Sequence, residues 1–111
     1  MGIQVKTDQD FREAIVKHKK VIVKYFADWC GSCKLLASKF KRLASDEKFK
    51  AITFIEVNAE ENPQAKALLN ELGGVQLVGL PFVATFKDGE LVEAHATSKE
   101  EVLITMLHKI Q

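Results

Sequence analysis

Residues 21–34 read VIVKYFADWCGSCK and join an apolar run to two cysteines that stand three positions apart. Up to Ala27 the run is β-branched and aromatic, broken by one lysine at position 24, and this pattern is typical of a buried central strand. After the cysteines, apolar residues recur at helical spacing and predict a helix that runs towards Phe49, with one face formed by Leu35, Leu36, Phe40, Leu43 and Ala44. The cysteines therefore lie where a strand gives way to a helix.

This position gives the cysteine pair a chemical meaning. The unpaired N–H groups and the positive dipole end at a helix start favour a thiolate at Cys30. Cys33 lies one turn later on the same face, within reach of a mixed disulfide formed at Cys30. Lys34 adds a cation beside the pair, and Trp29 offers a flat apolar surface to an incoming chain. The pattern indicates thiol–disulfide exchange.

Two other interpretations of the cysteines are weaker. A disulfide that closes so short a loop is a poor structural staple. Half of a zinc site would need further ligands, and the available histidines, His18, His95 and His108, are scattered without metal-site spacing. We therefore expect no metal.

The rest of the chain alternates between extended and helical patterns. Strands are expected at residues 3–6, 52–57, 82–87 and 90–95, the last two joined by the hairpin signal Asp88-Gly89. Thr7 and Ser98 are expected to cap helices, and Pro63 to open one that Gly73-Gly74 ends. The order βαβαβαββα predicts an α/β fold, a mixed sheet of about five strands with about four helices on both faces.

Composition limits the remaining possibilities. The 111 residues are 47% hydrophobic and fit a single domain over residues 1–111. Basic and acidic residues number 16 and 15, for a net charge of +1, and are mixed along the chain, so no nucleic-acid partner is indicated and a monomer is expected.

The location of the protein is predicted from what the chain lacks. No apolar run approaches the roughly 20 residues of a membrane span, and residues 1–6 lack the apolar region of a secretory signal. A cytoplasmic location is therefore expected. An exported one is the alternative, because the Met1-Gly2 start could be a cloning scar where a leader was removed.

Residues 25–34, together with Gly79-Leu80-Pro81 and the KDGE sequence at 87–90, resemble the thioredoxin family over nearly the whole chain. They also resemble the C-terminal domain of the bacterial transmembrane thiol:disulfide reductase. The resemblance implies the thioredoxin fold, protein disulfides as substrates and an upstream thiol reductase as electron donor. It implies no cofactor beyond the redox-active Cys30–Cys33 disulfide.

The resemblance also implies roles for individual residues. Cys30 becomes the nucleophile and Cys33 the resolving thiol, with a cis Leu80-Pro81 bond packed against their disulfide. A trans proline that opens the strand is the alternative. The substrate groove would consist of Trp29, Gly31, Ser32, Gly79, Leu80, Pro81 and His95. The alternative for His95 is a solvent-facing position at a strand end.

One departure from the family concerns proton transfer. Lys24 stands where thioredoxins usually carry a buried aspartate, and Glu56 stands where they usually carry a lysine. We expect a charge-swapped, partly buried ion pair behind Cys33, with Glu56 as proton acceptor during resolution. The alternative is that both side chains extend to the solvent-exposed rim of the sheet and have no effect on proton transfer at the cysteines.

Two further departures are in the motif and in a loop. Ser32 replaces the usual proline between the cysteines, which should shift the redox poise in a direction the sequence leaves open. The connection of residues 73–78 is about three residues longer than expected and could reshape partner choice or simply be tolerated. A protein-disulfide reductase is the favoured function. The alternatives are a thiol oxidase or isomerase, and a non-catalytic adaptor, against which the intact cysteines argue.

Overall fold

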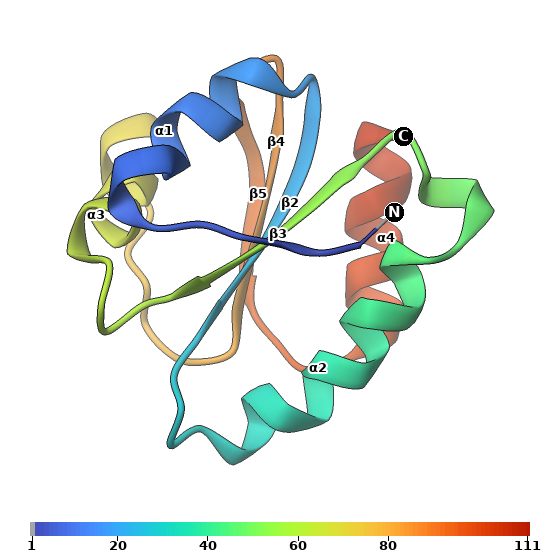
Figure 1. The fold of residues 1–111 in the computed structure, drawn as a ribbon, viewed down its shortest axis with the longest axis horizontal. Coiled ribbons are helices and arrows are strands. Elements are labelled where there is room, and N and C mark those ends of the chain that lie inside the picture. The colour runs from blue at the N-terminus through green and yellow to red at the C-terminus, as the bar shows by residue number, and fades with distance from the viewer. Residues whose placement is uncertain (1) are drawn as a thin grey trace.

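The computed structural model describes residues 2–111, and Met1 lies outside the described residues. A sheet of five strands stands between two pairs of helices (Figure 1). In chain order the elements are β1 (Gln4–Val5), α1 (Asp8–Lys17), β2 (Lys20–Phe26), α2 (Gly31–Ala44), a 3-10 turn (Glu47–Phe49), β3 (Thr53–Asn58), α3 (Pro63–Gly73), β4 (Phe82–Lys87), β5 (Glu90–Ala96) and α4 (Glu100–Ile110). The predicted fold class and element order are confirmed.

The sheet has the order β1-β3-β2-β4-β5. The strands β1, β3 and β2 run parallel, β4 is antiparallel to β2, and β5 is antiparallel to β4. The β4–β5 turn has positive φ at both Asp88 and Gly89, as the hairpin signal predicts. The strand β2 lies in the centre of the sheet, between β3 and β4. The cysteines follow its carboxyl end and are therefore attached to a strand that is hydrogen-bonded on both sides.

Each face of the sheet carries its own apolar core. On one face, the sheet packs against α1 and α3, with Phe11 edge-on to both Tyr25 and Phe86. On the other, it packs against α2 and α4, where Phe40 stands edge-on to Phe54 at 5.2 Å between ring centres. Figure 1 shows the two helix pairs on opposite sides of the sheet. The core thus anchors α2 beneath its first turn, which carries the cysteines.

The helix after the cysteines ends earlier than the sequence pattern predicts. It stops at Ala44, and a separate 3-10 turn follows that is capped by the Asp46 carboxylate, which accepts the Lys48 N–H at 2.9 Å. Leu35 is also not part of the buried face, because 65% of its surface is exposed. Its position lies about 100° around the helix from Leu36, which points into the core.

The last helix also begins differently from the prediction. Lys99, not Ser98, is the N-cap residue, and it makes no side-chain cap. Thr97 Oγ1 accepts the Lys99 N–H at 3.1 Å, while the Ser98 carbonyl accepts a hydrogen bond from the Lys39 ammonium. In residues 2–111, no helix is long and apolar enough to cross a membrane.

Candidate active site

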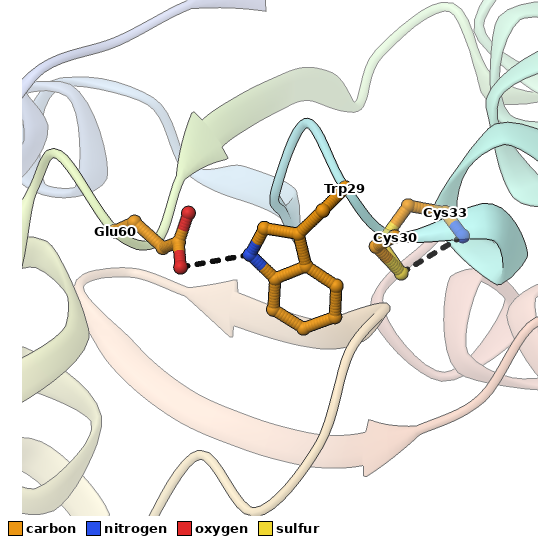
Figure 2. The surroundings of a disulfide bond; sticks show 4 residues. All are labelled: Trp29, Cys30, Cys33 and Glu60. Carbon is orange, nitrogen blue, oxygen red and sulfur yellow. Dashed lines mark hydrogen bonds between the residues drawn. A yellow bond between two sulfur atoms is a disulfide. The ribbon is translucent and has the colours of Figure 1, made fainter.

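Cys30 is the N-cap residue of α2, as the strand-to-helix prediction requires. Its backbone is extended (φ −83°, ψ 108°), and its sulfur accepts the Cys33 N–H at 3.1 Å. The two cysteines form a disulfide with 5.2 Å between their Cα atoms (Figure 2). The sulfur of Cys30 therefore lies at the positive end of the helix dipole and already accepts one of its free N–H groups.

The disulfide lies in an apolar setting. Both cysteines are at most 5% exposed, and with Ala27 they form a small cluster against which Phe26 and Leu80 pack. The Leu80-Pro81 bond is cis, as the resemblance implies, and Pro81 is buried. This arrangement places the segment before Pro81 beside the reactive sulfurs.

Trp29 covers one approach to the disulfide. Its side chain is 69% exposed, and its indole Nε1 donates a hydrogen bond of 2.8 Å to the Glu60 carboxylate. Figure 2 shows the indole between Glu60 and the disulfide. Glu60 is not among the site residues predicted from the sequence. Its acidic neighbour Glu61 and Pro63 mark a helix start, and nothing in that pattern points to Trp29.

The predicted ion pair between Lys24 and Glu56 is present. The two residues are direct partners on β2 and β3, and Lys24 Nζ lies 3.2 Å from Glu56 Oε2. The Lys24 side chain is only 4% exposed and the Glu56 side chain 25%, so the alternative with both at the rim is wrong for Lys24. The rings of Phe26 and Phe40 also lie within 5.7 Å of the ammonium.

The ion pair and Cys33 share a pocket. Its volume is about 240 Å³, and Lys24, Glu56, Cys33, Asp28 and Lys34 are among the residues that line it. Such a pocket has room for several water molecules and several polar partners for them. A proton could therefore move between the Cys33 sulfur and the Glu56 carboxylate without crossing the apolar core.

The remaining predicted groove residues lie in two places. Gly31 and Ser32 are exposed on the first turn of α2, and Gly79 is half-buried in the segment before Pro81. The Thr97 N–H donates a hydrogen bond of 3.1 Å to the Pro81 carbonyl. Thr97 thus lies next to Pro81, a neighbourhood that no sequence pattern predicted.

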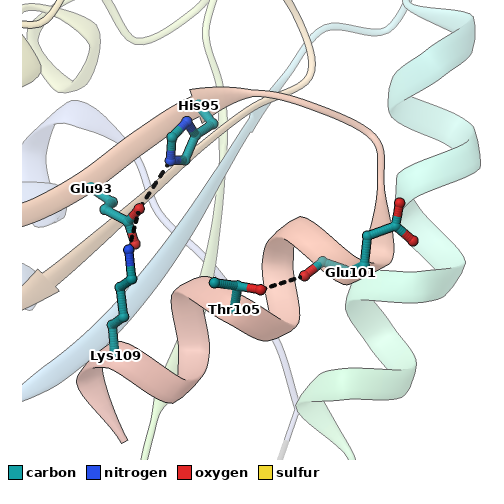
Figure 3. A network of polar contacts seen from close by, with 5 residues as sticks. All are labelled: Glu93, His95, Glu101, Thr105 and Lys109. Carbon is teal, nitrogen blue, oxygen red and sulfur yellow. Dashed lines mark hydrogen bonds and ion pairs between the residues drawn. The ribbon is translucent and has the colours of Figure 1, made fainter.

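The structure gives His95 a different neighbourhood from the predicted one. Its imidazole is 47% exposed and hydrogen-bonds Glu93 at 3.1 Å, and Lys109 of α4 contacts the same carboxylate oxygen (Figure 3). These contacts favour the solvent-facing alternative for His95. The hydrogen bond from His95, reinforced by Lys109, holds the pKa of Glu93 below its usual range.

Residues 2–111 contain no group of three or more His, Cys, Asp or Glu side chains that could hold a metal ion. The zinc interpretation therefore finds no set of ligands around the cysteines in this part of the chain. The chemistry that the site can perform is that of its two sulfurs. A disulfide between the N-cap of a helix and its first turn, set in the apolar end of a sheet, defines a thiol:disulfide oxidoreductase.

Comparison with known proteins gives the same class. The profile of the family described as Thioredoxin matches residues 2–109. A thioredoxin of Staphylococcus haemolyticus is 34% identical over 93 residues, which cover 84% of this chain and 82% of that protein. The chain belongs to the thioredoxin family.

Two more relatives show how far the likeness extends. Thioredoxin-2 of Pyricularia oryzae is 34% identical over 85 residues, covering 77% of this chain, which spans only 45% of that longer protein. The crystal structure of a Malassezia sympodialis thioredoxin superposes with a TM-score of 0.82 at 21% identity, over 99% of this chain and 94% of that one. The latter comparison establishes the fold.

Proposed function

We propose that this protein reduces protein disulfides by dithiol–disulfide exchange, with Cys30 as nucleophile and Cys33 as resolving thiol. The observation that carries the proposal is the hydrogen bond from the Cys33 N–H to the Cys30 sulfur at the start of α2. In the reduced protein the same N–H and the same dipole stabilise a thiolate on Cys30. The Cys33 sulfur does not receive this hydrogen bond, because the Cys33 N–H is itself the donor to Cys30.

The proposed cycle has two exchanges. The Cys30 thiolate attacks one sulfur of a substrate disulfide, forming a mixed disulfide and releasing the other substrate sulfur as a thiolate. Cys33 then loses its proton and attacks the Cys30 sulfur, which forms the Cys30–Cys33 disulfide and releases the second substrate thiolate. Two electrons pass to the substrate. An upstream thiol reductase then supplies two new electrons, which reduce the Cys30–Cys33 disulfide to the dithiol.

We assign the proton acceptor for the second exchange to Glu56. It borders the same pocket as Cys33, and its 25% exposure gives the accepted proton a way out to solvent. Lys24 acts through Glu56 as a positioning residue, because its buried ammonium holds the carboxylate 3.2 Å away at the wall of the pocket. The expected signature of Glu56→Gln is a changed pH profile of disulfide reduction. An unchanged profile would remove Glu56 from the mechanism.

For the substrate groove we propose the exposed surface around the disulfide. It consists of Trp29, Gly31, Ser32, Gly79, Leu80 and Pro81. Leu80 packs against the cysteine cluster, and the exposed indole of Trp29 supplies an apolar contact. His95 is left out of this groove, because its imidazole contacts Glu93.

The proposal extends to the setting of the reaction. We propose a monomer over residues 1–111 that acts in the cytoplasm, with an exported location as the alternative. The only cysteines form the reactive pair, so no separate disulfide staples the fold, as is usual in a reducing compartment. Fractionation of cells that express the native gene tests the location, and sedimentation tests the monomer.

Reduction of insulin disulfides by dithiothreitol tests the activity. The parent should accelerate precipitation of the insulin chains, and Cys30→Ser should abolish the acceleration. Cys33→Ser should accumulate a mixed disulfide with the substrate, because it retains the attack and lacks the resolution. Equal rates for Cys30→Ser and the parent would refute the enzymatic role and favour an adaptor.

The direction of exchange is tested separately by equilibration with glutathione buffers. A reduction potential near that of a reducing thioredoxin, about −270 mV, supports the reductase. A potential of about −180 mV or above would support the oxidase or isomerase instead.

A further inference from the structure

We propose that the end of the sheet opposite the disulfide is a docking surface for a membrane that contains anionic lipid. The occupant is a bilayer with negatively charged headgroups such as phosphatidylglycerol. The inference goes beyond the proposed function and does not depend on it, because it concerns where the protein is held. The surface, which we call the basic end, consists of Val16, Lys17, His18, Lys19, Lys20 and Lys87.

The fold gathers lysines from two distant parts of the sequence. Residues 17–20 read KHKK, while Lys87 belongs to the hairpin that joins β4 to β5. Lys20 and Lys87 are direct partners on β2 and β4, and the Asp88 N–H donates a hydrogen bond of 2.8 Å to the Lys19 carbonyl. Figure 1 shows the turn from α1 to β2 and the hairpin at the same end of the sheet. Charge that is evenly mixed along the sequence is therefore unevenly placed in the folded protein.

The lysines of the basic end have no acidic partners. Within residues 2–111, no ion pair includes Lys17, Lys19, Lys20 or Lys87. Like charges that stand directly opposite each other on neighbouring strands destabilise a sheet, and Lys20 and Lys87 are such a pair. A negatively charged partner relieves this repulsion. The arrangement is therefore suited to contact with an anionic surface.

The acidic residues nearby leave the basic end positively charged. The hairpin supplies two acidic residues, against four lysines at this end. Asp10 and Glu13 of α1 stand about 10 Å and about 6 Å before Lys17 along the helix axis, further from this end. They line a pocket with Lys6 as well as with Lys17. The loop of residues 45–52 contains two acidic residues and two lysines and adds no net charge.

An exposed apolar side chain favours a bilayer over other anionic partners. Val16 lies in the last turn of α1, is 72% exposed and directly precedes Lys17. Lysines beside an exposed apolar residue are typical of surfaces that lie at the headgroup boundary of a membrane. Residues 16–20 and 87–90 contain no aromatic side chain on which nucleic-acid bases could stack. The basic end is therefore suited to a membrane rather than to a nucleic acid.

The position of the basic end leaves the disulfide free to react. The strand β2 extends about 20 Å from Lys20 to Phe26, at about 3.3 Å per residue, and the disulfide lies beyond its far end. The loops at that far end, residues 27–30 and 59–62, contain three acidic residues and no basic one. An anionic membrane attracts the basic end and repels these loops. The docked protein thus presents its disulfide to the solvent.

Flotation with lipid vesicles tests the docking. The oxidised parent should bind vesicles made of phosphatidylcholine and phosphatidylglycerol in equal parts at about 0.1 M salt, and should be released at about 1 M salt, where charges are screened. It should not bind vesicles of phosphatidylcholine alone. Each lysine near an anionic surface contributes roughly fivefold to binding, so Lys17→Gln/Lys19→Gln should lower the partition coefficient about 25-fold. Both side chains are exposed, so the double substitution leaves the core intact.

The matched control removes the same charge from the other end of the molecule. Lys66→Gln/Lys99→Gln replaces two exposed lysines near the starts of α3 and α4 and gives the same net charge. Its partition coefficient should stay within about twofold of that of the parent. An equal fall in the two double variants would show that net charge alone attracts the protein, and would overturn the basic end as a docking surface. A parent that does not bind anionic vesicles would overturn it as well.

The role of Val16 separates a membrane from a nucleic acid. Val16→Ser should bind anionic vesicles roughly threefold more weakly than the parent, because it loses an apolar contact with the headgroup boundary. A parent that binds single-stranded RNA more tightly than anionic vesicles would overturn the membrane and identify a nucleic acid as the partner.

Trp29 reports the orientation of the docked protein. It is the only tryptophan of the chain and lies beside the disulfide, at the end opposite the basic end. In the oxidised parent bound to anionic vesicles, its fluorescence should keep its wavelength and should not be quenched by brominated lipid. A shift to shorter wavelength, or quenching by the lipid, would place the disulfide end in the membrane and overturn the proposal.

Discussion

Removal of either partner of the Lys24–Glu56 ion pair should destabilise the protein unequally. In Glu56→Gln the Lys24 ammonium remains, 4% exposed, with no carboxylate to balance it. In Lys24→Met the buried charge disappears, the long apolar stem is retained beside Phe26 and Phe40, and Glu56 keeps its access to water. We therefore expect Glu56→Gln to be the more damaging change.

The magnitude follows from the geometry. Two unit charges 3.2 Å apart attract by about 5 kcal/mol at an effective dielectric constant of 20. Desolvation of Lys24 offsets much of this attraction, and glutamine can still accept a hydrogen bond. We expect a loss of about 2 kcal/mol in the free energy of unfolding for Glu56→Gln and of at most about 0.5 kcal/mol for Lys24→Met. At this chain length about 2 kcal/mol lowers Tm by roughly 8 °C.

Urea unfolding of the oxidised parent, both single variants and the double variant gives the full cycle. The double variant should resemble Lys24→Met, since neither charge remains, and the coupling energy should be about 2 kcal/mol. A coupling energy below about 0.5 kcal/mol, or a greater loss in Lys24→Met than in Glu56→Gln, would refute the reasoning.

Three other substitutions each alter the hydrogen bonding of one polar side chain. Tyr25→Phe removes the buried hydrogen bond of 3.0 Å to the Ala65 carbonyl and should cost about 1 kcal/mol. Because burial raises the pKa of Tyr25, the parent should also lose stability above about pH 10, where the unfolded tyrosine ionises, and Tyr25→Phe should lose less in alkaline unfolding. The lowered pKa of Glu93 contributes stability at neutral pH that is lost in acid, as the pH falls through its folded-state pKa. His95→Gln should shift the NMR titration of the Glu93 carboxyl to higher pH. Thr85→Val should raise the free energy of unfolding by up to about 1 kcal/mol, since the buried Thr85 hydroxyl has no partner among residues 2–111.

Much of the fold could be predicted because local and long-range signals agree. The run from Val21 to Ala27 is apolar except for Lys24, and β2 is indeed buried between two neighbouring strands. The Asp88-Gly89 turn needs positive φ at both residues, which few other pairs adopt so readily. The spacing of the cysteines likewise determines their reach, because one helical turn separates them whatever the rest of the chain does.

The position of His95 could not be predicted, and the reason is a β-bulge. Phe86 pairs with Leu91 while Thr85 pairs with Glu93, so Val92 is an extra residue in β5. Beyond it every side chain changes face, and His95 becomes the partner of Val83 instead of Phe82. Val83 belongs to the core on the α2–α4 face, and this explains why His95 meets Lys109 of α4 through Glu93. Nothing in the alternation of residues 90–96 marks where a bulge falls.

The Lys24–Glu56 ion pair shows that the β2–β3 register determines which positions meet but not which of the two carries the positive charge. Parallel pairing of β2 with β3 brings positions 24 and 56 together, whether the positive charge is at position 24 or at position 56. The depth of each position is equally determined, because β2 is central and Lys24 is covered while Glu56 is a quarter exposed. Exchange of the charges therefore puts the cation in the deep position and the carboxylate in the shallow one. A carboxylate at the shallow position keeps part of its hydration, and in the proposed mechanism this gives a proton from Cys33 a short path to solvent. The buried lysine, which cannot accept a proton while charged, holds that carboxylate in place. If Glu56 is the proton acceptor, as we propose, the swapped pair places the accepting group nearer the surface than the buried position of Lys24.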